Sequence, residues 1–243
     1  MPSCFVSRSS FFVADRVYSM RVLALDTTTR AGSVALVEDD RTVDERPGDG
    51  SRSHAERLPG ELAALGAAWP TIDVFAVASG PGSFTGLRIG IATMQGLAAV
   101  TGRRAVGVSA LEALAQIAGA RLAAGALVGS WIDAQRGEVF SALYRIADAP
   151  LFTPERLVEI EPPAAASPDA TRAAWISHTL TGTCFTGDGA ARYLDGVESP
   201  PLLAGAIGRM AVIRASRGLD VSPAGLQPLY VRRPDVEIAR ERR

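Results

Sequence analysis

The first half of the chain is a series of short apolar runs separated by turns rich in Asp, Thr, Gly and Pro. Runs of this length between turn residues are typical of β strands, whereas apolar residues that recur every three or four positions indicate helices. The order predicts a βββαβα lobe. Its expected strands cover residues 22–25, 31–37, 41–45, 74–78 and 105–108, and its expected helices begin near Ser53, near Ser83 or Thr85, and at Ser109.

The first predicted helix carries a capping box, because Glu56 follows Ser53 at a distance of three residues. Pro59 lies inside the helical pattern, and we expect it to kink the helix or to mark its true start. The apolar face of this helix is formed by Leu58, Leu62 and Leu65.

The stretch 79–88 connects a predicted buried strand to the second helix through a turn rich in Gly and Pro. Such a turn offers backbone N–H groups to a phosphate or a carboxylate, but it is also an ordinary way to turn a corner. The helix that follows contains Gly86, Gly90 and Gly96. Each interior glycine costs up to ~1 kcal/mol relative to Ala, so we expect these glycines to let another helix pack closely.

The second half of the chain repeats one feature of the first. The run 127–132 ends in Asp133 and returns as 138–143, just as the first run ends in Asp26 and returns as 31–37. This unit, in which a strand ends in Asp and is followed by a turn and a second strand, occurs twice. The repetition indicates two similar lobes. The later elements are less regular: a strand at 157–160, a linker-like loop at 162–169, a strand that runs into Gly187, and a helix at 202–217.

The length of 243 residues, 47% of them hydrophobic, is enough to bury a large core. No run approaches the ~20 apolar residues of a membrane span, and two distant cysteines fit a reducing cytoplasm. We therefore expect a cytoplasmic protein without a membrane segment. We place a start-site extension or disordered arm at 1–19, an N-terminal lobe at 20–120, a second, smaller lobe at 121–217 and an extended tail at 218–243.

Charge limits the chemistry of this chain. The formal net charge is −1, so no strong overall attraction to nucleic acid or to an anionic membrane is indicated. All 25 basic residues are Arg, which excludes a lysine Schiff base and a complete P-loop. The two histidines, His54 and His178, are isolated in the sequence, so we expect no metal site and no catalytic residues.

Two acidic hairpin turns and a Gly-rich turn form the candidate site, a nucleotide cleft that is active or vestigial. Asp26 could hold a nucleotide phosphate through hydrated Mg²⁺, with help from neighbouring hydroxyl groups. The alternative is a local turn in which the Asp side chain accepts backbone hydrogen bonds. The candidate residues of this cleft are Asp26, Thr27, Thr28, Asp133, Gly187, Asp188 and Gly189.

Five segments together resemble the TsaB (YeaZ) family throughout residues 20–234. The long segment SGPGSFTGLRIG is the specific one, and the family commonly has Asp-Ala-Arg where this chain has Gln135 as the third residue. The resemblance implies the two-lobed α/β architecture of the ASKHA group, which includes actin, Hsp70 and sugar kinases and is RNase H-like. The five segments are 22–28 (VLALDTT), 79–90 (SGPGSFTGLRIG), 132–134 (IDA), 187–189 (GDG) and 228–232 (PLYVR).

The resemblance also implies a function. It implies threonylcarbamoylation (t6A) of the adenosine beside the tRNA anticodon, with this chain as the non-catalytic partner of the transferase TsaD and with the ATPase TsaE joining the complex. No cofactor of its own is implied, since ATP is used by the wider complex and tRNA is contacted through it. A homodimer is a possible form when TsaD is absent.

In this family two helices form the surface that pairs with TsaD or with a second copy. The same apolar faces could instead be core. The interface residues that the resemblance implies are Leu58, Leu62, Leu65, Gly86, Leu87, Gly90, Ile91 and Met94.

Two other functions remain open on the same fold. An ATP-dependent small-molecule kinase is suggested by the hairpins at Asp26 and Asp133. A metal-dependent transferase like TsaD is disfavoured, because TsaD-like proteins carry a His-x-x-x-His pair that this sequence lacks.

Overall fold

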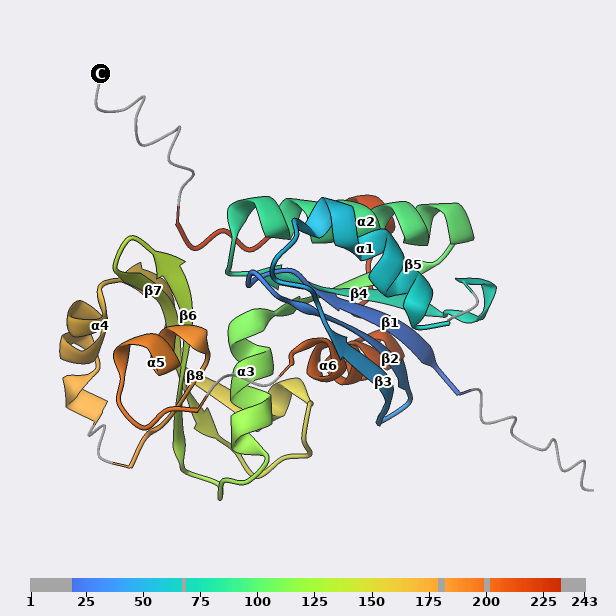
Figure 1. Ribbon diagram of the computed structural model, residues 1–243. Helices are drawn as coiled ribbons and strands as arrows, with labels where there is room; N and C mark the ends of the chain where they lie inside the picture. Colours follow the sequence, from blue (N-terminus) through green and yellow to red (C-terminus); the bar gives the residue numbers. More distant parts are fainter. Residues whose placement is uncertain (1–18, 67–68, 179–181, 199–201, 233–243) are drawn as a thin grey trace, which may run out of the picture.

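Residues 19–66, 69–178, 182–198 and 202–232 are described by the computed structural model, and they form two lobes that lie side by side (Figure 1). Almost all of the predicted arm at 1–19, and the end of the predicted tail, lie outside these ranges. Each lobe is built on its own sheet, which confirms the two-lobed α/β fold class. Within the described ranges, no helix combines the length and the apolar character needed to cross a membrane.

The first sheet has five strands in the order β3-β2-β1-β4-β5. The first three strands are antiparallel, whereas β1, β4 and β5 run parallel and are connected by helices. This arrangement confirms the predicted order of elements. The elements are β1 (Arg21–Asp26), β2 (Ser33–Glu38), β3 (Arg41–Pro47), α1 (His54–Ala64), a short 3-10 turn (Trp69–Thr71), β4 (Val74–Gly80), α2 (Phe84–Thr101), β5 (Arg104–Ser109) and α3 (Ala110–Gly119).

Side chains on β1 alternate between the two faces of the first sheet, as the period of two in a strand requires. Leu23 and Leu25 pack in one cluster with residues of α1 and α2, and Val22 and Ala24 pack in another on the opposite face. A central strand that is buried on both faces has apolar residues at every position. This explains the unbroken apolar run in the sequence.

Helix α1 begins where the capping box predicts. The backbone N–H and the hydroxyl of Ser53 donate to Glu56 Oε2 at 3.0 and 2.7 Å. Pro59 lies inside α1, so the expectation that it could mark the start of the helix is wrong. The helix already has its N-terminus at the capping box, five residues earlier.

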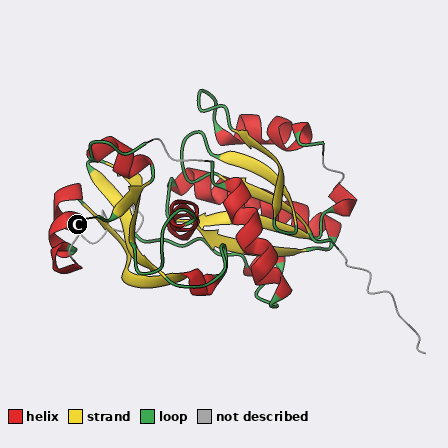
Figure 2. Cartoon of the chain, turned by 90° about the horizontal axis from the view of Figure 1, so that it is seen from below, coloured by secondary structure: helices red, strands yellow, loops and turns green. Residues whose placement is uncertain are grey.

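The second sheet has four strands in the order β8-β7-β6-β9. The chain forms this lobe in the order βββαβα, and its first two strands are the repeated hairpin that the sequence predicts. Seen from below, the two sheets lie beside each other with helices around them (Figure 2). The elements are β6 (Leu127–Gln135), β7 (Glu138–Ile146), a 3-10 turn (Pro154–Arg156), β8 (Leu157–Ala166), α4 (Pro168–Ala174), a 3-10 turn (Ile176–His178), β9 (Cys184–Thr186) and α5 (Asp188–Tyr193).

Strand β8 is longer than the sequence suggested. Residues 162–166, predicted as part of a loop, continue the strand through two prolines. β8 is an edge strand, and its pairing with β7 is irregular between Glu161 and Ala164, where Pro162 and Pro163 lie. Proline is tolerated at an edge or a bulge because no ladder hydrogen bond is required from its nitrogen.

Helix α6 (Ala204–Ser216), which the sequence placed in the second lobe, lies against the first sheet (Figure 1). A Cβ atom added at Gly208 would lie 2.5 Å from Val37 Cγ2 and 3.2 Å from Ala24 Cβ, so helix and sheet are in close contact. The Ser33 hydroxyl accepts a hydrogen bond from Ala204 N at 3.0 Å. Small residues on both sides allow this approach. A last 3-10 turn (Pro223–Gly225) follows.

Helix α3 lies between the lobes in Figure 1. One buried cluster runs from Val22 in the first sheet through Leu111 and Leu114 of α3 to Ile132 and Phe140 in the second. The two lobes therefore share a continuous apolar core on this side, and the floor of the space between them is held in a defined position.

Candidate functional site

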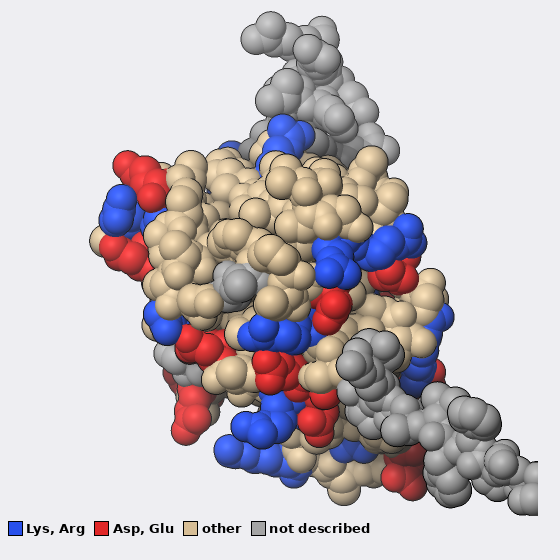
Figure 3. Space-filling model, turned by 90° about the vertical axis from the view of Figure 1, so that its right-hand side faces the viewer, with Lys and Arg blue, Asp and Glu red and all other residues tan. Residues whose placement is uncertain are grey.

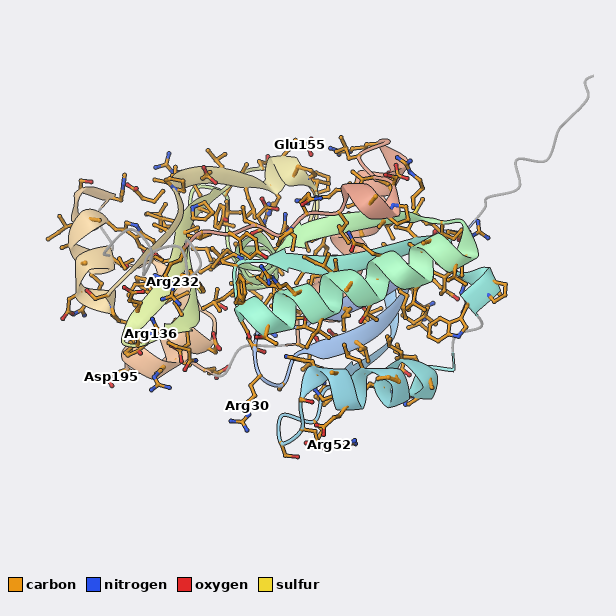
Figure 4. All side chains as sticks on the ribbon, turned by 90° about the horizontal axis from the view of Figure 1, so that it is seen from above. Arg30, Arg52, Arg136, Glu155, Asp195 and Arg232 are labelled. Carbon is orange, nitrogen blue, oxygen red and sulfur yellow. The ribbon has the colours of Figure 1, made fainter. Side chains whose placement is uncertain are left out.

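A cleft of about 1330 Å³ opens between the two lobes. Its walls come from six segments: the tip of the β1–β2 hairpin, residues 51–54 at the start of α1, the turn before α2 with the first residues of that helix, the β6–β7 hairpin, α5, and residues 229–232 near the C-terminus. Figure 4 shows Arg30 and Arg52 extending from the first lobe, and Arg232 of the C-terminal segment lying beside the second lobe. The cleft thus joins four of the predicted motifs to two segments that had no predicted role in the site.

Asp26 is buried at the end of β1, and its carboxylate is engaged locally. Asp26 Oδ1 accepts hydrogen bonds from the Thr28 backbone N–H at 2.8 Å and from the Thr28 hydroxyl at 2.6 Å. Burial raises the pKa of Asp26, and the charge of Asp188 raises it further, while the Thr28 hydrogen bonds and Arg57 oppose this. This geometry is that of an Asx turn, the alternative weighed for this residue.

Asp188 is the first residue of α5 and lies in the predicted Gly-rich turn of the second lobe. Its Oδ1 accepts hydrogen bonds from Asp133 N at 3.0 Å and from its neighbour Gly189 N at 2.8 Å. Burial raises the pKa of Asp188, opposed by these hydrogen bonds, and the charge of Asp133 also raises it. A small cavity of about 130 Å³ is lined by both Asp26 and Asp188, so the structure brings the first predicted acidic turn and the predicted Gly-rich turn together.

Asp133 lies at the edge of this floor. Its Oδ1 accepts from Gln135 N at 3.0 Å, and its Oδ2 accepts from Gln135 Nε2 at 3.1 Å and lies 3.4 Å from Arg192 Nη1. Gln135, the residue that departs from the family pattern, therefore holds the carboxylate of its own turn. The positive charge beside Asp133 comes from Arg192 in α5 instead.

The two glycines of the predicted Gly-rich turn, Gly187 and Gly189, allow close backbone packing. A Cβ atom at Gly187 would overlap Trp131 O, and one at Gly189 would lie 2.8 Å from the carbonyl carbon of Ile132. Gly187 also has a φ of +108°, which favours glycine. These two positions therefore hold the start of α5 against β6.

Thr27 explains two of the glycines in α2. Its side chain is fully buried, and a Cβ atom added at Gly90 would overlap Thr27 Oγ1. One added at Gly86 would overlap Thr27 O. We expected these glycines to admit a partner helix, and that expectation is wrong: they admit the tip of the β1–β2 hairpin of the same lobe.

The apolar residues predicted for the partner interface face inward. Their side chains form the packing between α1, α2 and the first sheet. As a direct interface this prediction is corrected, because a side chain that the lobe itself covers has no surface to offer. The eight predicted residues, all buried, are Leu58, Leu62, Leu65, Gly86, Leu87, Gly90, Ile91 and Met94.

The opposite sides of the same helices are exposed and rich in small, uncharged residues. In α2 the only charged residue is Arg88, near its start. Figure 3 shows few charged side chains on the upper part of the molecule, where α2 lies, and mixed charges below. Exposed members of this outer face are Pro59, Gly60, Ala63 and Ala64 in α1 and Ala92, Gly96, Ala99 and Val100 in α2.

A buried arginine, which the sequence did not single out, anchors the start of α1. Arg57 donates to Glu61 Oε1 at 2.6 Å, contacts His54 Nδ1 at 2.6 Å and donates to the carbonyl oxygen of Ala31. Burial and the neighbouring positive charge of Arg57 lower the pKa of His54. His54 is thus half-buried beside Arg57, whereas its isolation in the sequence gave no sign of this contact.

The C-terminal segment was also missed as a part of the site. Leu229 N donates to Ser79 O at 2.7 Å, which fixes the segment beside the Gly-Pro-Gly turn. Farther along, Arg232 reaches the second lobe and forms an ion pair with Glu138 at 2.7 Å. The signal in the sequence was the segment PLYVR, but its position over the cleft depends on contacts with residues far away in the chain.

Comparisons with known proteins agree with this architecture. Residues 45–167 match the family described as TsaD: tRNA N6-adenosine threonylcarbamoyltransferase. A crystal structure from Pseudomonas aeruginosa, of an uncharacterized protein with similarity to the peptidase YeaZ, superposes with a TM-score of 0.71. It is 29% identical and covers 88% of this chain and 100% of its own.

Two curated relatives extend the comparison. The tRNA threonylcarbamoyladenosine biosynthesis protein TsaB of Escherichia coli is 41% identical over 130 residues, which are 52% of this chain and 55% of that protein. An uncharacterized protein of Mycobacterium leprae is 33% identical over 227 residues, 89% of this chain and 56% of its own length. The matched parts thus span little more than half the length of these relatives. The chain belongs to the family described by the TsaD model and, within it, to the TsaB (YeaZ) proteins.

Proposed function

We propose that this chain takes part in forming threonylcarbamoyladenosine in tRNA. The observation that carries the proposal is the 41% identity to a protein named for the biosynthesis of that nucleoside. The match of residues 45–167 to the threonylcarbamoyltransferase family supports it independently. The YeaZ-like fold covers nearly the whole described chain, so the proposal does not depend on one short motif.

We further propose that its role is that of a non-catalytic subunit which needs no nucleotide of its own. Support comes from the floor of the cleft, where Asp26 Oδ1 accepts two hydrogen bonds from Thr28 and Asp188 Oδ1 accepts two from backbone N–H groups. An oxygen atom engaged in this way is a structural acceptor for nearby backbone and hydroxyl groups. ATP is then used elsewhere in the complex, and the kinase alternative has less support.

The partner that we propose is TsaD, with TsaE joining the pair, and the outer face of α1 and α2 is the surface we assign to it. Small residues let two helices approach closely, and Val100 on this face is 89% exposed. A second copy of this chain could occupy the same face when TsaD is absent. Contact with tRNA as a substrate then occurs within the assembled complex.

Reconstitution tests the function directly. TsaD, TsaE and the synthase that makes threonylcarbamoyl-AMP are incubated with tRNA, with and without this chain, and t6A is measured by mass spectrometry of the digested RNA. Formation of t6A is expected to require the chain. The same yield without it would contradict the proposal.

A pull-down with TsaD tests the surface. Gly96→Arg should abolish capture, because it places a large charged side chain on the proposed contact face. The variant should still fold, because no atom lies within 4 Å of a Cβ built at Gly96. Ala173→Arg is the matched control, since Ala173 is exposed on α4 in the other lobe. If Gly96→Arg and Ala173→Arg bind TsaD equally well, the partner does not use this face.

A further inference from the structure

The rim of the interlobe cleft is positively charged, although the chain as a whole has a net charge of −1. Two acidic residues, Asp133 and Asp188, line the same cleft. Within the described residues, positive charge is thus concentrated where the lobes meet. The five arginines in the lining are Arg30, Arg52, Arg88, Arg192 and Arg232.

Both lobes contribute to this rim. Arg30 and Arg52 come from the first lobe (Figure 4), whereas Arg192 comes from α5 in the second lobe and Arg232 from the C-terminal segment. Arg192 remains 63% exposed beside Asp133. A guanidinium group carries five N–H donors, so one ion pair leaves donors for a further anion. The rim can therefore bind several negative charges spaced along a strand.

Two exposed aromatic rings lie at the mouth of the cleft. Phe84 is 39% exposed and Tyr230 is 41% exposed, with their ring centroids 5.6 Å apart. The Arg88 guanidinium lies 3.9 Å from the Phe84 centroid, and its Nε donates to the Tyr230 hydroxyl at 3.2 Å. An aromatic pair held in place by an arginine, beside further arginines, is a surface on which a nucleic-acid base can stack.

The floor of the cleft has the opposite character to the rim. Asp26 and Asp188 line the small cavity between the lobes, and burial raises the pKa of each. Phosphate groups placed at that depth would meet carboxylates, whereas phosphate groups along the rim would meet arginines. The distribution of charge therefore favours an extended polyanion across the opening over a nucleotide inserted into it.

We propose that the rim of the cleft binds a single-stranded segment of RNA, with phosphate groups on the five arginines and bases stacked on Tyr230 and Phe84. That the strand is RNA rests on the proposed function, whereas the pattern of charge and aromatic rings does not. In this proposal the chain contributes its own RNA contacts in addition to any that are made by a partner.

Fluorescence anisotropy with the full-length protein tests the proposal. The probes are a labelled RNA stem-loop that contains an anticodon loop, a fully paired RNA duplex and a DNA stem-loop of the same sequence. The RNA stem-loop should bind with a micromolar Kd at moderate salt and more tightly than the duplex. Absence of saturable binding at low salt, or displacement of the RNA by ATP, would overturn the proposal. Equal binding of the DNA stem-loop would overturn the assignment to RNA.

Arginine variants identify the surface. Arg52→Gln with Arg192→Gln removes two exposed charges from opposite lobes, and Arg41→Gln with Arg121→Gln removes two exposed charges outside the cleft lining. The plot of log K against log salt should become shallower by about 1.4 for the first pair, because each phosphate contact on a single strand contributes about 0.7. Equal changes in the two double variants would assign the binding to general charge and overturn the proposed site.

Tyr230 variants test the stacking. Tyr230→Ala should weaken binding of the stem-loop by about fivefold or more, and Tyr230→Phe should retain it, because the ring supplies the contact. Thermal unfolding of each variant confirms that the lobe is intact, and unchanged affinity of a folded Tyr230→Ala protein would contradict the stacking. If t6A formation requires the chain but RNA binding fails, only this inference falls. If RNA binds but t6A forms without the chain, the proposed function falls instead.

Discussion

The two sides of helix α2 differ more from each other than its sequence suggests. On the inner side Gly86 and Gly90 lie against the hairpin tip at Thr27, and Met94 is completely buried. On the outer side Gly96 has open space around it and Val100 is largely exposed. Both sides are rich in small and apolar residues, so residue type alone does not show which face of this helix is core and which is exposed.

The difference shows what glycine does at each place in this helix. At Gly86 and Gly90 a Cβ atom would overlap Thr27, so the absence of a side chain is required by the fold. At Gly96 nothing in the lobe requires it, although glycine lowers helix stability by about 1 kcal/mol relative to Ala. A residue that costs stability without serving the monomer is consistent with a role in contact with a partner.

The largest expected effect is the loss of stability when a side chain on the inner side of α2 is truncated, compared with the same change on the outer side. Met94→Ala removes a fully buried side chain next to the first sheet and should lower the free energy of unfolding by about 3 kcal/mol. Val100→Ala, on the outer side, should change it by less than about 0.5 kcal/mol. Urea unfolding followed by circular dichroism measures both values, and similar losses at the two positions would contradict the division into inner and outer faces.

A double-mutant cycle isolates the contact between α2 and the hairpin. Gly90→Ala should cost about 2 kcal/mol through overlap with Thr27 Oγ1, in spite of the better helix propensity of Ala. Thr27→Ala removes that oxygen atom, which has no hydrogen-bond partner among the described residues. The double variant should therefore recover most of the loss. Additive costs would show that the strain at Gly90 arises elsewhere.

Features of the fold that depend on local sequence were predicted better than features that depend on long-range contacts. The apolar run at 22–25 and the capping box at Ser53 depend on neighbours in sequence, and the structure confirms both the strand and the start of the helix. The extension of β8 through Pro162 was missed, because tolerance of proline depends on the strand being at an edge. The inward orientation of Met94 was left open beside an interface role, because an apolar helix face does not reveal whether a sheet or a partner covers it.

The candidate site likewise has parts that the sequence predicted and parts that it did not. The repeated hairpin brought Asp26 and Asp133 into the prediction, and their turns do lie at one cleft together with Asp188. The arginines of the rim were not predicted as a group, since Arg52 and Arg232 are far apart in the chain and meet only through the packing of the two lobes. Whether the cleft is vestigial stays a prediction.

A smaller effect of opposite sign is expected on the outer side of α2. Gly96→Ala should raise the free energy of unfolding by about 1 kcal/mol, because the added Cβ meets no neighbour and the helix gains propensity. Thermal and urea unfolding measure the gain, and a pull-down shows whether TsaD tolerates the methyl group. Destabilisation by this change would mean that Gly96 is packed as tightly as Gly90.

The smallest expected effect is on the pH dependence of stability and involves His54, which lies beside the N-terminal end of α2. Its Nε2 lies 3.3 Å from the position of a Cβ atom built on Gly86. Burial and Arg57 lower the pKa of His54 from 6.5, while the Thr29 backbone and Glu61 oppose this. As the pH falls through 6.5, His54 in the unfolded chain takes up a proton before His54 in the folded protein does. The free energy of unfolding should therefore decrease from about pH 6.5 down to the lowered pKa of the folded state. Below that pKa, His54 should cause no further loss. His54→Gln should remove that part of the pH dependence of urea unfolding, measured from about pH 7.5 to about pH 5, which brackets the ordinary pKa of His. An unchanged slope in the variant would place His54 in solvent, with the inner side of α2 open at this end.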